Sequence, residues 1–274
     1  MASPVIVLFA ACILGVAFSL SELATGAPHI RQDDSQLAEF LRATYGSKAS
    51  AATSWDEQTE NNTRPGIKRV VCANHKATTP SRTREWLAVC MTTNPAAHGE
   101  AGKIDFYSLR ESGGQFVIES SLTNYESGSS GVPGTVSVLA LGSGAEGFRV
   151  EEGWVGQGQV IKTQALLASH DRLIVEVAKL RKGLDNSMMF EGDAPAPEVM
   201  SKKIQLKFDL SFDKAGSGIL YPLAVRERGT ECGRAVKRIW KLTFDAALWR
   251  YRIPKALMRE ECLRPEDESG VAHK

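Results

Sequence analysis

The sequence has none of the short motifs that mark the common catalytic and cofactor sites. It contains no G-x-S-x-G elbow, no H-E-x-x-H pair, no P-loop and no EF-hand loop. It also has no C-x-x-C pair, which excludes the usual zinc and dithiol redox arrangements. No cofactor and no metal site are therefore predicted, although a catalytic site assembled from distant residues would leave no local motif.

The chain also lacks a large net charge, because 33 Lys and Arg residues face 32 Asp and Glu residues, giving +1 at pH 7. Proteins that bind nucleic acids usually carry a basic stripe, so no nucleic-acid partner is predicted. The densest basic run covers residues 226–241, and glutamates interrupt it. We interpret this run as a solvated hairpin with outward Lys and Arg, with an anion-binding patch as the alternative.

Residues 4–18 form an uncharged apolar run that is too short for a typical membrane span but typical of a signal-peptide core. Small residues at Ala24 and Gly26 suit cleavage before Ala27. The sequence thus predicts a signal peptide over residues 1–26, export to the periplasm or the extracellular space, and no membrane span in the mature chain. Because no Lys or Arg precedes the apolar run, an uncleaved anchor stays open, as does a lipoprotein attached at Cys12.

Four cysteines remain after removal of residues 1–26, namely Cys72, Cys90, Cys232 and Cys262. An even number of cysteines in an exported chain favours disulfides. Four cysteines allow three pairings. We favour the two local bridges, Cys72–Cys90 and Cys232–Cys262, because each pair flanks a compact stretch and short loops close easily.

A single amphipathic helix is predicted near the N-terminus, over residues 33–46. Leu37, Phe40, Leu41 and Tyr45 recur there at helical spacing, and Gly46 suits the helix end. The next twenty residues are small and polar. Residues 27–66 are therefore interpreted as a helix followed by a polar linker.

From residue 67 onward the chain alternates as β-strands do. The segment 204–212, IQLKFDLSF, places five large apolar residues on one face and polar residues on the other. About a dozen such segments predict a mainly β fold, an antiparallel two-sheet sandwich or a barrel-like meander. The predicted β domain covers residues 67–265, with a flexible tail at 266–274; a separate domain over 200–265 is the alternative. In the segment 236–244, Arg238 interrupts an otherwise apolar face.

The best cluster of polar residues for catalysis lies in the segment 94–105, where His98 is followed by Glu100 and Asp105. These three are weak catalytic candidates, because a lone histidine in a loop is more often only solvated.

The segment 128–158 contains nine glycines, which suit tight turns and bulges in a β-meander. Trp154 lies within this segment, and an exposed aromatic in a Gly-rich loop is a typical recognition anchor. Trp154, Tyr125, Ser129 and Gln157 are the predicted binding residues. The alternative for Trp154 is that its ring folds back to cap the sheet.

These features favour an exported, non-catalytic binding protein, such as an inhibitor, an immunity-type protein or an assembly subunit, whose partner is an unidentified protein. Two alternatives stay open. One is a hydrolase that acts in the cell envelope, and the other is a β-barrel carrier of a small apolar ligand.

Overall fold

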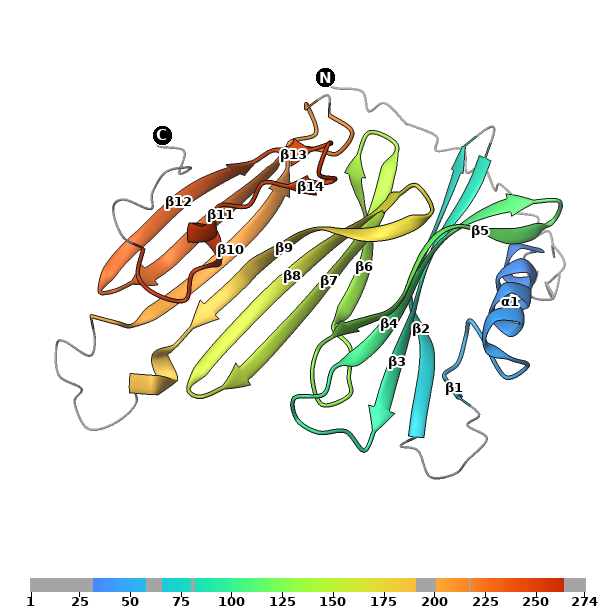
Figure 1. The fold of residues 1–274 in the computed structure, drawn as a ribbon, viewed down its shortest axis with the longest axis horizontal. Coiled ribbons are helices and arrows are strands. Elements are labelled where there is room, and N and C mark those ends of the chain that lie inside the picture. Colours follow the sequence, from blue (N-terminus) through green and yellow to red (C-terminus); the bar gives the residue numbers. More distant parts are fainter. Residues whose placement is uncertain (1–31, 58–65, 80–81, 191–200, 217, 264–274) are drawn as a thin grey trace, which may run out of the picture. The chain divides into compact units, whose positions relative to one another are not determined.

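The structure, a computed structural model, describes residues 32–57, 66–79, 82–190, 201–216 and 218–263 (Figure 1). One α-helix, α1 (Gln32–Tyr45), precedes all the strands, and two short 3-10 helices are η1 (Ser187–Phe190) and η2 (Lys255–Met258). The strands are β1 (Trp55–Asp56), β2 (Gly66–Thr79), β3 (Arg82–Asn94), β4 (Gly102–Ser112), β5 (Gln115–Ser127), β6 (Thr135–Gly142), β7 (Ala145–Gly156), β8 (Gln159–His170), β9 (Leu173–Asp185), β10 (Ile204–Phe212), β11 (Leu223–Glu231), β12 (Arg234–Leu242), β13 (Phe244–Asp245) and β14 (Arg250–Tyr251).

Twelve of these strands form one curled sheet. Its main path runs β1-β2-β3-β4-β5-β9-β10-β11-β12, and β8, β7 and β6 branch from β9. Strand β9 makes this branching possible, because β8 pairs along it while β10 pairs only with its last residues, Gly183–Asp185. The remaining two strands, β13 and β14, form a separate small sheet.

The predicted mainly β fold, with a single helix before about a dozen strands, is confirmed. Two details differ from a strictly antiparallel two-sheet sandwich. The large sheet is continuous, and it contains one parallel pairing, Ser121 of β5 with Leu173 of β9. The barrel-like alternative is therefore nearer to the observed arrangement.

Helix α1 covers one face of β3 and β4 (Figure 1). Leu37, Phe40 and Leu41 are buried against Leu87 and Tyr107 of those strands. The helix ends at Gly46, which has a φ of +95° and so suits the left-handed turn that often closes a helix. The predicted helix and its docking role are thus confirmed.

The opposite face of β3 and β4 packs against β6, β7 and β8. The interior there is filled by large side chains, including Trp86, Phe106 and Phe148, whose rings contact one another. Strand β3 is therefore buried on both faces, since its even-numbered residues point to this interior and its odd-numbered residues to α1.

A second interior lies under β9–β12. The apolar face of β10 is buried as the alternation of 204–212 predicts, and Trp240 of β12 lies in the same cluster. The segment after β12 covers this face, with Tyr251 and Leu257 buried in it. The structure contains the disulfides Cys72–Cys90 and Cys232–Cys262, the two local pairs favoured from the sequence.

The predicted signal peptide at residues 1–26 and the predicted tail at 266–274 lie outside the described residues. The described residues from Gln32 onward belong to one compact unit, and β10, β11 and β12 share the large sheet with the earlier strands.

Candidate functional site

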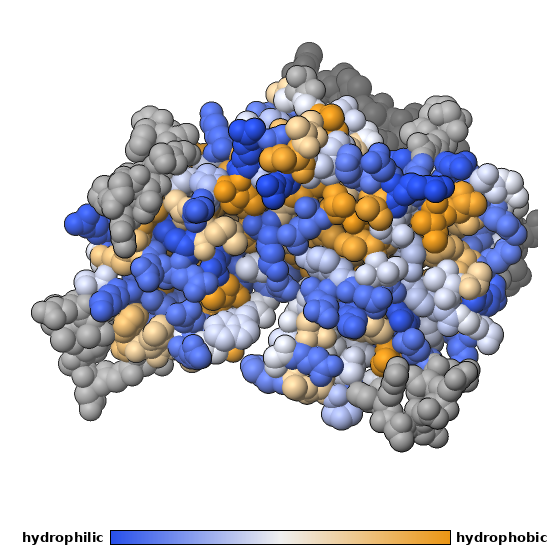
Figure 2. Space-filling model, in the orientation of Figure 1, coloured by the Kyte–Doolittle hydropathy of each residue, from blue (hydrophilic) through white to orange (hydrophobic). Residues whose placement is uncertain are grey.

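The most exposed apolar side chains of one corner gather at the end of the β7–β8 hairpin and on η1. They are Trp154, Val155, Met188 and Met189, with exposed fractions of 41, 55, 52 and 51%. Figure 2 shows pale orange, moderately hydrophobic residues where Figure 1 places η1. We call these four residues the hairpin surface.

The hairpin surface owes its form to the tight turn between β7 and β8. Gln157 and Gly158 make this turn with φ values of +52° and +75°, the conformation that matches the twist of two paired strands. Glycine is needed on both sides of the turn. A Cβ on Gly156 would lie 2.4 Å from the Trp154 ring, and one on Gly158 would lie 2.7 Å from Cγ of Met189. The missing side chains let Trp154 and Met189 lie flat on the hairpin.

The Trp154 ring thus lies beside Gly156 of its own strand, and the residue is 41% exposed. Gln157, also a predicted binding residue, is exposed at the turn beside it. Met188 and Met189 had not been singled out from the sequence. The signal was the pair of adjacent methionines in an otherwise irregular segment, but only the fold brings Met189 to the hairpin turn, where it lies against Gly158 and Gln159.

The other two predicted binding residues, Tyr125 and Ser129, belong to different surroundings. Tyr125 packs its ring edge-on against Phe106 and donates its hydroxyl to Glu176 at 2.8 Å. Burial and the neighbouring Glu176 carboxylate raise the pKa of Tyr125, so it stays a donor. Ser129 exchanges two backbone hydrogen bonds with Val132 in a tight turn. Both residues have structural partners.

Glu152 connects that turn to the base of the hairpin. Its carboxylate accepts hydrogen bonds from the Ser127 hydroxyl and the Gly128 amide, both at 2.9 Å, and pairs with Lys179 at 2.9 Å. Burial opposes ionisation of Glu152, but the hydrogen bonds from Gly128, Lys179 and Ser127 outweigh it and lower the pKa. This ionised carboxylate holds the strand that carries Trp154, two residues further on.

The predicted catalytic candidates separate into two places. His98 and Glu100 lie in the loop between β3 and β4, where Ser130 Oγ is 3.4 Å from His98 Nδ1 and the Ala97 amide donates to Glu100. Asp105 lies on β4 in a different cluster. Among the described residues, no hydrogen bond or ion pair joins Asp105 to either of the other two.

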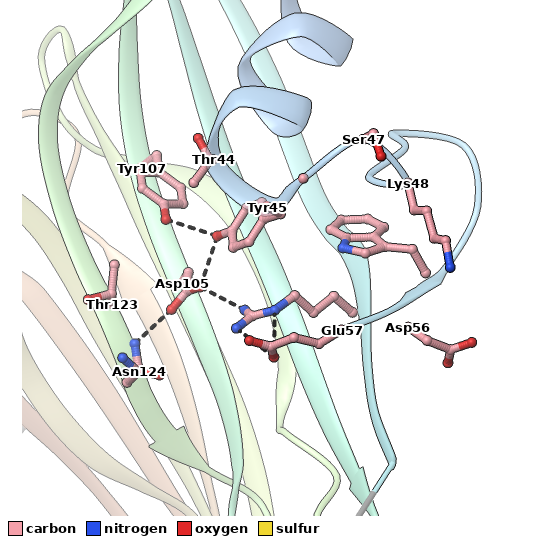
Figure 3. Close-up of a pocket in the computed structure, with 13 residues that line it drawn as sticks. Thr44, Tyr45, Ser47, Lys48, Asp56, Glu57, Asp105, Tyr107, Thr123 and Asn124 are labelled. Atoms are coloured by element: carbon pink, nitrogen blue, oxygen red, sulfur yellow. Dashed lines mark hydrogen bonds and ion pairs between the residues drawn. The ribbon is translucent and has the colours of Figure 1, made fainter. Parts of the chain in front are cut away.

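Asp105 is the centre of a buried network beneath the end of α1 (Figure 3). It accepts hydrogen bonds from Arg69 at 3.0 Å, from the Tyr45 hydroxyl at 2.8 Å and from the Asn124 amide at 2.7 Å. The Tyr107 hydroxyl lies 2.9 Å from that of Tyr45. Burial, followed by the charge of Asp105, raises the pKa of Tyr45, so its proton stays in place. Asp105 is thus engaged by three donors and is poorly suited to act as a base.

Arg69 completes the network. Its guanidinium pairs with Asp105 and with Glu57 at 3.2 Å, and it lies 4.8 Å from the centre of the Tyr45 ring. The cationic group therefore joins helix α1, strand β2 and strand β4, and its contact with an aromatic ring adds a cation–π attraction. These contacts fix the helix end on the sheet.

A cavity of about 570 Å³ opens beside this network, between the helix end and β1. Lys48, Asp56 and Glu57 are among the residues that line it (Figure 3). Trp55 also lines it, and the buried indole N–H of Trp55 has no hydrogen-bond partner in the structure. The charged groups of its inner wall, Asp105, Arg69 and Glu57, are already paired with one another.

Among the described residues, no group of three or more His, Cys, Asp or Glu side chains is placed to hold a metal ion. Within the same part of the chain, no helix combines the length and the apolar character that a membrane crossing requires. Comparisons with models of protein families, with curated proteins and with solved structures gave no match.

Proposed function

We propose that this chain is an exported, non-catalytic binding protein that contacts a protein partner through the hairpin surface. The observation that carries this proposal is that four large apolar side chains, each between 41 and 55% exposed, lie at the end of the β7–β8 hairpin and on η1, which contacts the hairpin turn. Trp154 and Val155 are neighbours on one strand and face opposite sides of the hairpin. Exposed apolar patches of this kind typify interaction sites, and tryptophan is the residue most enriched among binding hot spots.

The chemistry of the hairpin surface suits a protein partner. Trp154 presents a large, rigid ring on a backbone held by the turn at Gln157 and Gly158. Met188 and Met189 are flexible and polarisable, so they adapt to an irregular apolar partner. A rigid anchor next to adaptable side chains is the arrangement that keeps the entropic cost of binding low.

The polar clusters support a non-catalytic role. Asp105 is occupied by three internal donors, and the His98 ring has the Ser130 hydroxyl at 3.4 Å and, within the described ranges, no carboxylate in hydrogen-bond contact. The filled interiors around Phe106 and Trp240 give no support to a carrier of an apolar ligand. The two disulfides are the kind of cross-link that persists in oxidising compartments, which supports export.

The test places a photo-crosslinking amino acid at Met189 in the full chain and exposes cells to light. We expect one dominant cross-linked protein, which is then purified and its affinity for the unmodified chain measured. Trp154→Ala should weaken that affinity by at least about thirtyfold, the scale of a hot-spot residue. The melting temperature should change little, because the ring is 41% exposed.

Ile118→Ala is the matched control, since Ile118 of β5 is 52% exposed and lies outside the hairpin surface. Its affinity for the partner should equal that of the unmodified chain. Equal losses in Ile118→Ala and Trp154→Ala, or no loss in either, would exclude the hairpin surface as the binding site.

A further inference from the structure

Five directly paired residues form a straight line across the outer face of β8–β12. Lys162 pairs with Gly183, Gly183 with Lys207, Lys207 with Arg228, and Arg228 with Lys237. Figure 1 shows these five strands side by side in that order. Neighbouring strands lie about 4.8 Å apart, so the line spans about 19 Å. We call its four positive residues the cation row.

The cation row is unfavourable for the stability of the sheet. Lys207 and Arg228 are directly opposite each other, as are Arg228 and Lys237, and like charges in such positions are destabilising. Arg228 has one ion pair, with Asp209 at 2.8 Å, and both side chains are more than half exposed. Within the part of the chain that the structure describes, Lys162, Lys207 and Lys237 have no ion-pair partner. The three lysines of the row are therefore available to an external anion, whereas Arg228 shares its charge with Asp209.

The surface along the row is hollowed. A depression of about 740 Å³ lies over β8–β11 and a second of about 430 Å³ lies over β11 and β12, and Arg228 lines both. Gly183 leaves a gap between Lys162 and Lys207. No neighbour requires glycine there, because a Cβ would meet nothing nearer than 3.7 Å. The absent side chain leaves room for a ligand between the two lysines.

We propose that the cation row binds an acidic polysaccharide lying across the strands. A single line of cations matches a chain that carries its negative groups in one dimension. On one side of the row, the paired positions Gln205 and Thr230 are polar, uncharged and exposed, so they can bond to sugar hydroxyls. On the other side the paired positions are Asp209 and Arg226. This site lies on a different set of strands from Trp154 and does not depend on the proposed protein partner.

A nucleic acid fits this surface less well. Single-stranded nucleic acids are bound by aromatic side chains on which the bases stack. The one aromatic residue that lines either depression is Phe208, which is buried from the opposite face of the sheet. An acidic polypeptide is the other competitor, and the experiment separates it from the polysaccharide.

The test measures the affinity of the full-length mature chain for a fluorescent oligogalacturonate by anisotropy, between 50 and 200 mM salt. We expect saturable binding that falls by roughly tenfold or more over this range, because each contact with a charged polymer releases counterions. Polyglutamate of equal length and an oligothymidylate are measured in parallel and should bind more weakly.

Two matched pairs of variants locate the site. Lys207→Gln should weaken oligogalacturonate binding about fivefold, the scale of one cation near an anionic surface. Lys241→Gln removes an exposed lysine of β12 that is paired with Ala224 and lies outside the row, and it should have no effect. Gly183→Glu places a carboxylate in the centre of the row and should abolish binding, whereas Gly183→Gln adds the same bulk without the charge and should bind more tightly than Gly183→Glu.

Equal losses in Lys207→Gln and Lys241→Gln would mean diffuse attraction and would overturn the proposal. Tighter binding of polyglutamate or oligothymidylate would assign the row to an acidic protein or a nucleic acid. Absence of oligogalacturonate binding at 50 mM salt would also refute it. If Gly183→Glu does not fold, the comparison of Lys207→Gln with Lys241→Gln decides by itself whether the cation row is the binding site. Trp154→Ala should bind oligogalacturonate with the affinity of the unmodified chain. A loss of partner binding at the hairpin surface can therefore be distinguished from a loss of polysaccharide binding at the cation row.

Discussion

The two faces of the β11–β12 hairpin differ in whether their charged residues lie next to opposite or like charges. On the inner face, the fully buried Glu227 accepts hydrogen bonds from Arg238 at 3.1 Å, from Arg259, and from the indole N–H of Trp240 at 2.7 Å. On the outer face, the next residue, Arg228, stands opposite Lys237. Glu227 therefore lies in a cluster of paired charges, whereas the next residue of the same strand, Arg228, lies in a row of like charges.

The inner cluster also fastens the C-terminal segment. Glu231 pairs with Arg238 and Arg259 and accepts the backbone amide of Leu263, and the disulfide Cys232–Cys262 closes the same segment onto the sheet. Every charge there has an opposite charge within contact. The inner face is thus organised for stability, whereas the outer face retains repulsion that stability alone would not favour. This contrast teaches that two faces of one hairpin with similar numbers of charges can differ in whether those charges are paired within the protein.

Breaking the inner cluster should have the largest effect. Glu227→Ala leaves the buried Trp240 N–H without its acceptor and leaves Arg238 and Arg259 with Glu231 as their shared carboxylate, which should reduce the free energy of unfolding by about 3–5 kcal/mol. Urea denaturation measures the change. The outer-face control Asp209→Ala removes an exposed ion pair and should cost no more than about 1 kcal/mol. Similar losses in the two variants would contradict the contrast between the faces.

Lowering the pH should reduce the stability of the protein by protonating Glu231 on the inner face. Burial opposes its ionisation, but hydrogen bonds from Arg238 and Arg259 and the charge of Arg259 lower its pKa below the ordinary 4.5. A carboxyl group whose pKa is lowered by folding stabilises the protein above its unfolded pKa, and this stabilisation is lost as the pH falls through the folded value. Glu231→Gln should therefore be less stable than the unmodified chain at pH 7, and the difference should shrink as the pH falls below 4.5. Thermal melts from pH 7 to pH 3 measure it, and a constant difference would exclude this linkage.

Relieving the outer face should have the smallest effect, and of opposite sign. Lys207→Gln removes a charge opposite Arg228, so the free energy of unfolding should stay the same or rise by up to about 0.5 kcal/mol. At 1 M salt the screening length is about 3 Å, and any gain should vanish. Urea denaturation at low and high salt measures both values. A clear loss of stability would show that Lys207 has a structural role.

The candidate sites were predictable only where the signal is local. Trp154 and Gln157 could be chosen because a tryptophan and a tight turn lie in one Gly-rich segment. Met188 and Met189 could not, because they follow β9 and reach the hairpin only through the pairing of β8 with β9. Asp105 was selected for its nearness in sequence to His98, yet its partners, Tyr45 and Arg69, come from distant segments.

Arg238 illustrates the same limit. In the sequence it interrupts an apolar face and makes the register of that strand uncertain. In the structure it lies on that face as expected from the alternation, because Glu227 is directly opposite in register and neutralises it. The predicted alternation of the strand was correct, and Arg238, the polar residue that interrupts its apolar face, belongs to a buried ion pair.

The sequence by itself determined which residues form the strands and the helix, and which side chains of each share a face, because a period of two or 3.6 residues is a local property of the chain. Only the tertiary structure decided which residues of different strands and segments lie opposite each other. The register that aligns Lys162, Lys207, Arg228 and Lys237, and the burial that pairs Glu227 with Arg259, follow from the packing of strands and segments far apart in the chain. A one-residue shift in register would exchange the two faces, so packing of the apolar face is what selects it.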